Sequence, residues 1–110
     1  MDAIAERRME LRSADHSIVV VVRLGRPELD ATHDSWKCEY EIRFGDTTRS
    51  MAMHGGDALQ ALQLSIATLD VELEHGAKKY GGVLWHLDEP FSSVLEHSGL
   101  QVKPLSGAAE

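Results

Sequence analysis

The sequence predicts an α+β domain, a two-layer antiparallel meander of four to five strands packed on one long helix. Two observations predict this fold class. Apolar and polar residues alternate along several segments joined by short turns, as in half-buried strands. One later segment carries leucine and isoleucine at spacings of three and four, as in an amphipathic helix. At 110 residues the chain has room for one domain, which we place at 1–98, with a C-terminal tail at 99–110.

The predicted strands differ in how clearly the sequence marks them. Alternation is cleanest from Trp36 to Phe44, and Gly45-Asp46 follows at once, which suits a tight hairpin. β-Branched residues fall on both faces of the second strand, as expected of a strand covered on both sides. Segment 26–35 has no periodicity and is predicted to be a long loop. The four sequential strands are predicted at 5–12, 17–24, 36–44 and 47–53.

The predicted helix runs from about Ala58 to about His75. Asp57 is a good N-cap, and Gln60 three positions later completes a capping-box-like pair. Gly76 follows at a natural C-cap position. The residues expected to face the sheet are Leu59, Leu62, Ile66, Leu69 and Leu73.

Two short elements are predicted after the helix. Residues 83–87 have the composition of a fifth strand, and Pro90 ends it. Residues 91–95 are predicted to form a helical turn that packs back on the domain.

Composition argues against several classes of partner. The formal charge of −7 lacks the basic footprint that nucleic acid or an anionic membrane requires, so we expect neither. The longest apolar run, residues 18–22, is far too short to span a bilayer. The first residues lack the pattern of a signal peptide, so a cytoplasmic location is expected. The single cysteine, Cys38, is expected to be a small buried hydrophobe.

A second apolar stripe does not fit a helix that packs on one sheet. It lies on the helix roughly opposite the face that is expected to meet the sheet. The strand at 17–24 shows a similar feature, because some of its valines point to the face opposite its other apolar residues. Either segment 83–95 or a loop covers the stripe, or the stripe is the interface of a twofold dimer. The candidate interface residues are Leu64, Ala67, Val71, Val19 and Val21.

Residues that could perform chemistry are sparse. The six histidines are scattered singly, without the close helical spacing of a zinc motif, so no metal site, cofactor or catalytic residue is expected. Gly55-Gly56-Asp57 lacks the Lys-Ser/Thr of a phosphate-binding loop and is better explained as a helix cap. If folding assembles a ligand site, its candidates are His33, Asp34, His54 and Asp57.

Three segments resemble a family of short bacterial proteins that is known only as a domain of unknown function. They are Ile4-Ala5-Glu6-Arg7-Arg8-Met9-Glu10-Leu11, Val22-Arg23-Leu24-Gly25-Arg26-Pro27 and Asp57-Ala58-Leu59-Gln60-Ala61-Leu62-Gln63-Leu64. The resemblance implies a bacterial source and a small stand-alone domain. It implies no activity, cofactor or catalytic residue.

These observations favour a non-enzymatic protein-binding module that acts as a homodimer. One version is an immunity-like protein whose acidic surface masks a basic protein partner such as a toxin. The alternative is a small enzyme or ligand-binding protein that uses the 26–35 loop and the N-terminus of the helix.

Overall fold

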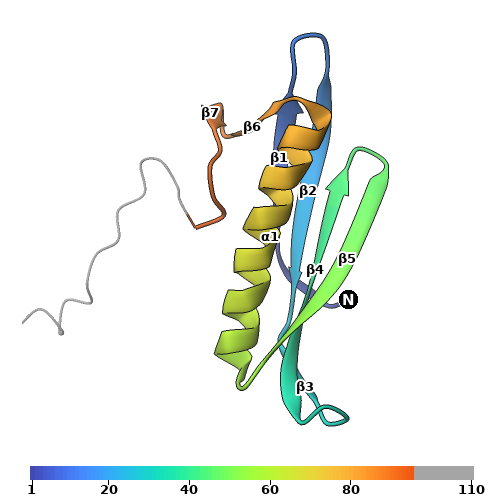
Figure 1. Cartoon of the computed structure of the whole chain (residues 1–110), viewed down its shortest axis with the longest axis vertical. Coiled ribbons are helices and arrows are strands. Elements are labelled where there is room, and N and C mark those ends of the chain that lie inside the picture. Colours follow the sequence, from blue (N-terminus) through green and yellow to red (C-terminus); the bar gives the residue numbers. More distant parts are fainter. Residues whose placement is uncertain (96–110) are drawn as a thin grey trace, which may run out of the picture.

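The structure, a computed structural model, describes residues 1–95 and confirms the α+β class. A seven-stranded antiparallel sheet forms one layer and a single helix the other (Figure 1). The predicted tail at 99–110 and the last residues of the predicted domain lie outside the described residues. The elements are β1 (Ala3–Arg12), β2 (Ser17–Gly25), β3 (Glu28–Asp30), β4 (Ser35–Phe44), β5 (Thr47–Gly55), α1 (Ala58–Tyr80), β6 (Val83–His86) and β7 (Glu89–Pro90).

The predicted meander is present, and two further strands extend it. Tyr40 of β4 pairs with β2 on one side and β5 on the other, whereas Trp36 of β4 lies between β3 and β5. β3 therefore continues the line of β2 along the same edge of β4. Pro27 lies at the break between them, and proline lacks the N–H that a ladder needs. Across the sheet the order is β5, β4, β2 in line with β3, β1, β6 and β7.

Three predictions for the segments outside the four main strands and the helix are wrong. The expected 26–35 loop contains β3, which is too short to show any alternation in sequence. Leu87 and Asp88 both have positive φ and make a two-residue turn, so β6 ends at His86 and pairs with β7. Residues 91–95 are not a helical turn, because the Val94 N–H donates to the Asp70 carboxylate at 2.6 Å.

The helix begins as predicted and ends later. The Asp57 carboxylate accepts from the Gln60 N–H at 2.7 Å, while the Gln60 side chain accepts from the N–H of Gly56. The helix continues past Gly76 and stops at Gly81, whose φ of 66° and two backbone hydrogen bonds make the C-cap. Gly76 lies inside the helix against the ring of Phe44, so close packing and not termination explains this glycine.

The face that α1 turns to the sheet is rotated from the predicted one. Leu69 and Leu73 are buried as predicted, but Leu59 is 63% exposed, and the innermost positions also include Ala61 and Ser65. These small side chains let the helix backbone approach β4 and β5, and the Ser65 hydroxyl donates to the Cys38 carbonyl at 2.7 Å. The buried core comprises Met9, Leu11, Val20, Val22, Tyr40, Ile42, Leu69, Leu73 and Leu84.

Candidate functional site

One long edge of the sheet is open. Among residues 1–95, β5 pairs with β4 alone, so the opposite side of this nine-residue strand carries backbone groups with no strand beside them. Its pairing with β4 is regular from Thr47 to Gly55, without a bulge. The strand contains no proline and no lysine, and Arg49 is its only residue of the Asp, Glu, Lys and Arg types. β5 therefore lacks most of the devices that protect an edge strand from pairing with another chain.

The opposite edge of the sheet is protected in several ways. Its last strand, β7, has two residues, of which Glu89 is charged and Pro90 cannot donate to a ladder. The Arg12 guanidinium also lies over the Trp85 ring of β6, 4.5 Å from its centre, and so places a positive charge beside this strand.

β6 pairs only with residues 10–12 of β1, so residues 3–9 of β1 also have no strand beside them among residues 1–95. The segment after β7 passes that part of β1, and the Val94 carbonyl accepts a hydrogen bond from Arg7. β5 is therefore the edge strand that is open along its whole length, and it is the one that could accept a partner strand.

Exposed apolar side chains accompany β5 on the helix side. Met51 of β5 and Leu64 of α1 are partly exposed, and Val71 of α1 is 55% exposed. Next to Val71, a groove of about 530 Å³ runs between the helix and the ends of β4 and β5. It is lined by Ile42, Phe44, Thr47, Arg49, His75 and Lys79, among others.

A polar chain lies beside this groove. The Tyr40 hydroxyl donates to the Glu72 carboxylate, and Arg49 forms an ion pair with the same carboxylate at 2.5 Å. Burial of the Tyr40 ring, together with Glu72, raises the pKa of that hydroxyl well above its usual range. The only arginine of β5 is therefore already paired within its own chain.

The five predicted interface residues do not lie on one surface. Leu64, Ala67 and Val71 are exposed on α1. The described part of the segment after β6, residues 87–95, does not cover them, because Val94 packs on the other flank of the helix beside Ile66. Val19 is exposed on the face of the sheet away from the helix.

Val21 is a wrong prediction, since it is only 4% exposed. It is paired with Arg8 of β1 on one side and Arg43 of β4 on the other, and long arginine stems cover apolar surface between them.

A second feature lies at the end of the sheet that carries β3 (the bottom of Figure 1). The Asp30 carboxylate is 2.8 Å from Nδ1 of His33 and 3.3 Å from Nε2 of His54. These contacts, His33 first, lower the pKa of Asp30. One ligand atom from each of the three residues lies within 4.8 Å of the other two, so the group could hold a metal ion.

Folding brings together two of the four predicted ligand residues. His33 and His54 belong to this group, whereas Asp34 and Asp57 do not. Asp34 has a positive φ of 47° in the turn after β3, and Asp57 is occupied as the helix cap. The residue that sequence reasoning missed is Asp30, and the spacing Asp-x-x-His in a turn was the one local signal for it.

The sequence matches the family described as a domain of unknown function (DUF6968) over residues 5–94. The chain belongs to this family. No curated protein and no solved structure matches it. The matched segment runs from β1 past β7, so it includes both the open edge of β5 and the Asp30 group.

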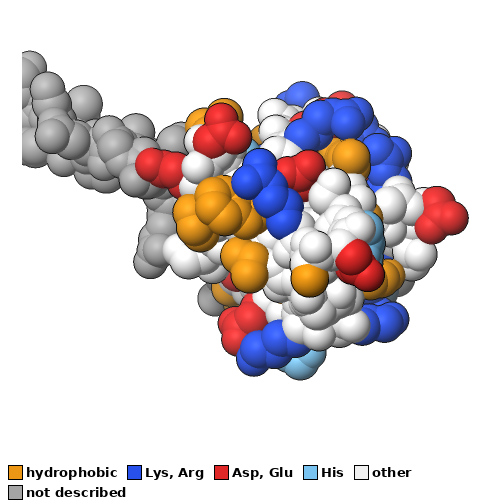
Figure 2. Space-filling view, turned by 90° about the horizontal axis from the view of Figure 1, so that it is seen from above, with side chains coloured by type: hydrophobic (Ala, Val, Ile, Leu, Met, Phe, Trp, Pro, Cys, Tyr) orange, Lys and Arg blue, Asp and Glu red, His pale blue; other side chains and the backbone are white. Residues whose placement is uncertain are grey.

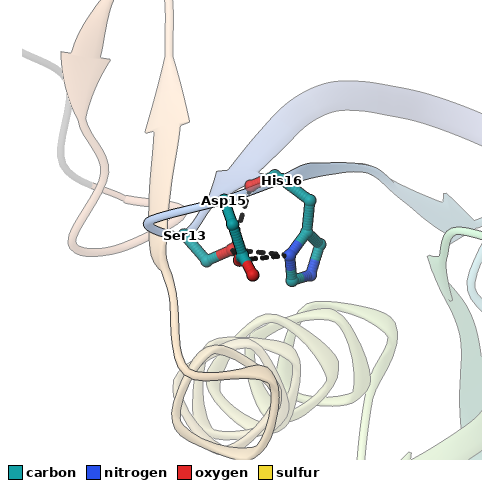
Figure 3. Close-up of polar contacts among 3 residues, drawn as sticks. All are labelled: Ser13, Asp15 and His16. Atoms are coloured by element: carbon teal, nitrogen blue, oxygen red, sulfur yellow. Dashed lines mark hydrogen bonds and ion pairs between the residues drawn. The ribbon is translucent and has the colours of Figure 1, made fainter.

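A third group in this DUF6968 domain has the composition of a catalytic triad without its geometry. Ser13, Asp15 and His16 lie on the turn between β1 and β2 (Figure 3). The serine oxygen is 3.0 Å and the aspartate oxygen 2.8 Å from the same ring nitrogen, Nδ1 of His16. A triad needs the acid and the nucleophile on different nitrogens, so that a proton can be taken from the serine. This group is a polar turn.

Cys38 is buried in the DUF6968 core, and burial raises the pKa of its thiol. We expect a soluble disulfide reagent at neutral pH to modify Cys38 at least about 100-fold more slowly in the folded chain than in urea, because only the opened state exposes the thiolate. Absorbance of the released thiol measures both rates. Equal rates would show that the strand pairing around Cys38 opens freely.

Charge is mixed at the end of the domain seen in Figure 2. Lysine and arginine side chains alternate there with aspartate and glutamate, and hydrophobic patches lie between them.

Within the part of the chain that the structure describes, no helix has the length and apolar character needed to cross a bilayer.

Proposed function

We propose that this domain is a non-enzymatic protein-binding module that assembles as a homodimer through β5. One observation carries the proposal: β5 has a nine-residue open edge, and the exposed side chains of Met51, Leu64 and Val71 lie on the same side of the molecule. A second strand added to this edge would satisfy the open backbone groups. The helix of the second copy would at the same time cover the apolar flank of α1 in the first copy.

A second copy of the chain is the partner that fits this edge best. Two β5 strands can pair antiparallel about a twofold axis, which makes the interface self-complementary. With the axis near Met51, Arg49 of one copy lies opposite Met53 of the other, so like charges do not meet. The pairing of Arg49 with Glu72 inside each copy further limits repulsion.

The flank of α1 is needed as well as the strand. Stable interfaces bury about 1,600 Å² in total, which is more than one pair of strand edges provides. Leu64 and Val71 supply apolar area next to the edge. Leu64, Ala67 and Val71 are also the helix residues that the sequence pattern offers as candidates for an interface. Strand pairing would set the register, and burial of the helix flank would supply most of the affinity.

The change Val71→Glu tests the proposal. Both copies would then bury an unpaired carboxylate, so we expect the dimer Kd to rise about 30-fold or more, the equivalent of about 2 kcal/mol. Light scattering coupled to size exclusion, over a dilution series, measures the fraction of dimer.

Leu59→Glu is the matched control, because Leu59 is an equally exposed residue on the other flank of the same helix. It should leave the dimer unchanged. Wild-type chain that stays monomeric at every concentration, or equal weakening by the two substitutions, would count against a β5 interface.

We also propose a bacterial, cytoplasmic setting and, as one version of the role, capture of a basic protein. The family resemblance supports the first, and the single unpaired cysteine suits a reducing compartment. The net charge of −7 supports the second. Capture of a basic partner that did not weaken with added salt would contradict this version.

A further inference from the structure

We propose that Asp30, His33 and His54 bind a divalent transition-metal ion of the Zn²⁺ class. The three residues come from β3, from the turn that follows it and from β5, and each offers one ligand atom to a common point. The site is distinct from the proposed dimer contacts, because His54, although it belongs to β5, pairs with Lys37 and so faces the side of the sheet opposite Met51 and α1.

The spacing of the ligand atoms suits such an ion. Zinc lies about 2.0–2.2 Å from nitrogen and carboxylate oxygen ligands, and in a tetrahedral site these atoms are then about 3.3 Å apart. Oδ2 of Asp30 is 2.8 Å from Nδ1 of His33 and 3.3 Å from Nε2 of His54. All three ligand atoms lie within 4.8 Å of one another, so side-chain rotations that close these distances would let one ion replace the hydrogen bonds between them.

The donor set selects the kind of metal. Two imidazoles and one carboxylate suit zinc and neighbouring transition metals, whereas Ca²⁺ and Mg²⁺ require mostly oxygen ligands. Three protein ligands leave a fourth position for water or for a ligand atom from outside.

The sheet holds two of the three ligands, Asp30 and His54, at fixed positions. In the β-ladders Asp30 lies opposite Ser35 and His54 lies opposite Lys37, so the two ligands lie on either side of β4, two residues apart along it and on the same face of the sheet. The Ser35 hydroxyl oxygen is buried and has no hydrogen-bond partner among residues 1–95. It lies opposite Asp30 in the ladder and does not contact the Asp30 carboxylate in this structure.

Access and charge also favour a cation at this position. The Asp30 carboxylate is only 16% exposed, while both histidine rings are open to solvent, so an ion can reach the group directly. The acidic balance of the chain attracts cations. Lys37, next to His54 in the register, opposes this attraction and would limit the affinity. A bound ion would fasten the turn after β3 onto β5.

Titration of chelator-treated protein with zinc chloride tests the proposal, with isothermal calorimetry as the measurement. We expect one site per chain that His33→Gln and His54→Gln each weaken about 100-fold or more, since even residues behind the ligands change metal affinity 10–100-fold. Cobalt chloride, added instead of zinc, should give the visible absorption of a nitrogen-ligated ion, and this absorption should be lost in the same variants.

His16→Gln is the matched control. His16 also contacts an aspartate, Asp15, at 2.8 Å, but among residues 1–95 no second histidine joins them. This variant should bind zinc within about twofold of wild type, and circular dichroism should show the same fold in every variant. If a histidine variant does not fold, Asp30→Asn takes its place in the same titration. No zinc binding by wild type, or equal binding by wild type and the cluster variants, would overturn the proposal.

Discussion

Leu73→Ala should lower the free energy of unfolding by about 2–5 kcal/mol. The Leu73 side chain is 1% exposed and belongs to the core between α1 and the sheet, so its loss removes buried methyl groups and leaves a cavity. A domain of this size has about 5–15 kcal/mol of stability in total, so this single change removes a large part of it. Urea unfolding followed by circular dichroism measures the difference as a lower transition midpoint.

Leu59→Ala is the control for this prediction, because it makes the same chemical change on the same helix. Leu59 is 63% exposed, and its loss should cost less than about 0.5 kcal/mol. The pair therefore tests which face of α1 meets the sheet. If Leu59→Ala lowered the free energy of unfolding as much as Leu73→Ala, Leu59 would face the sheet, as periodicity alone predicts. That result would contradict the observed rotation of the helix.

Gly55→Ala should destabilise the fold by about 1–3 kcal/mol, and Gly55→Val by more. A Cβ added at Gly55 would lie 2.6 Å from the backbone nitrogen of Ala61, so the first turn of α1 would have to move away from β5. Backbone cannot rotate aside as a flexible side chain can, and the strain would be shared between the strand and the helix. Thermal unfolding, followed by circular dichroism, measures the loss as a lower Tm.

Gly56→Ala, one residue later, should have little effect. A Cβ there would meet only the end of the Gln60 side chain, at 3.4 Å. The hydrogen bond from the Gly56 N–H to that side chain uses backbone and would remain. Equal losses of Tm at the two glycines would indicate a general cost of replacing glycine and not a close contact between β5 and α1.

Local signals in the sequence were sufficient for much of the fold. The inward row of β4, from Trp36 to Phe44, depends only on the alternation of side chains along a strand, and its buried members are the predicted ones. The start of α1 depends on Asp57 and Gln60, which lie three positions apart and contact one another directly. Both features could be predicted because the residues that decide them are neighbours in the chain.

The end and the rotation of α1 could not be predicted in the same way. Gly76 has the local appearance of a C-cap, but its reason is the Phe44 ring, which lies on another strand. Likewise, Ser65 faces inward because its hydroxyl reaches the Cys38 carbonyl across the layer boundary. Hydrophobic periodicity favours large apolar residues at such positions and cannot show that a close approach requires small ones.

The two candidate surfaces depend on strand pairing. Asp30 and His54 meet only because β3 and β5 lie on either side of β4, and three-residue β3 gives no alternation from which to predict it. The sequence did single out His33 and His54 among six histidines, as residues of a loop and of the segment before the helix. The apolar helix stripe was visible in sequence as well, whereas the open edge beside it follows only from the strand order.

The position of β6 has a consequence for how the chain assembles. Most strand pairs join neighbouring segments through short turns, but β6 pairs with β1, and β2, β3, β4, β5 and α1 all lie between them in the chain. Bringing such distant segments together costs more chain entropy than closing a hairpin. The β1–β2 and β4–β5 hairpins can each form as local units, whereas β6 finds its place only after α1 has crossed the sheet. Synthesis from the N-terminus therefore leaves residues 10–12 of β1 without their neighbouring strand until residues 83–86 are made.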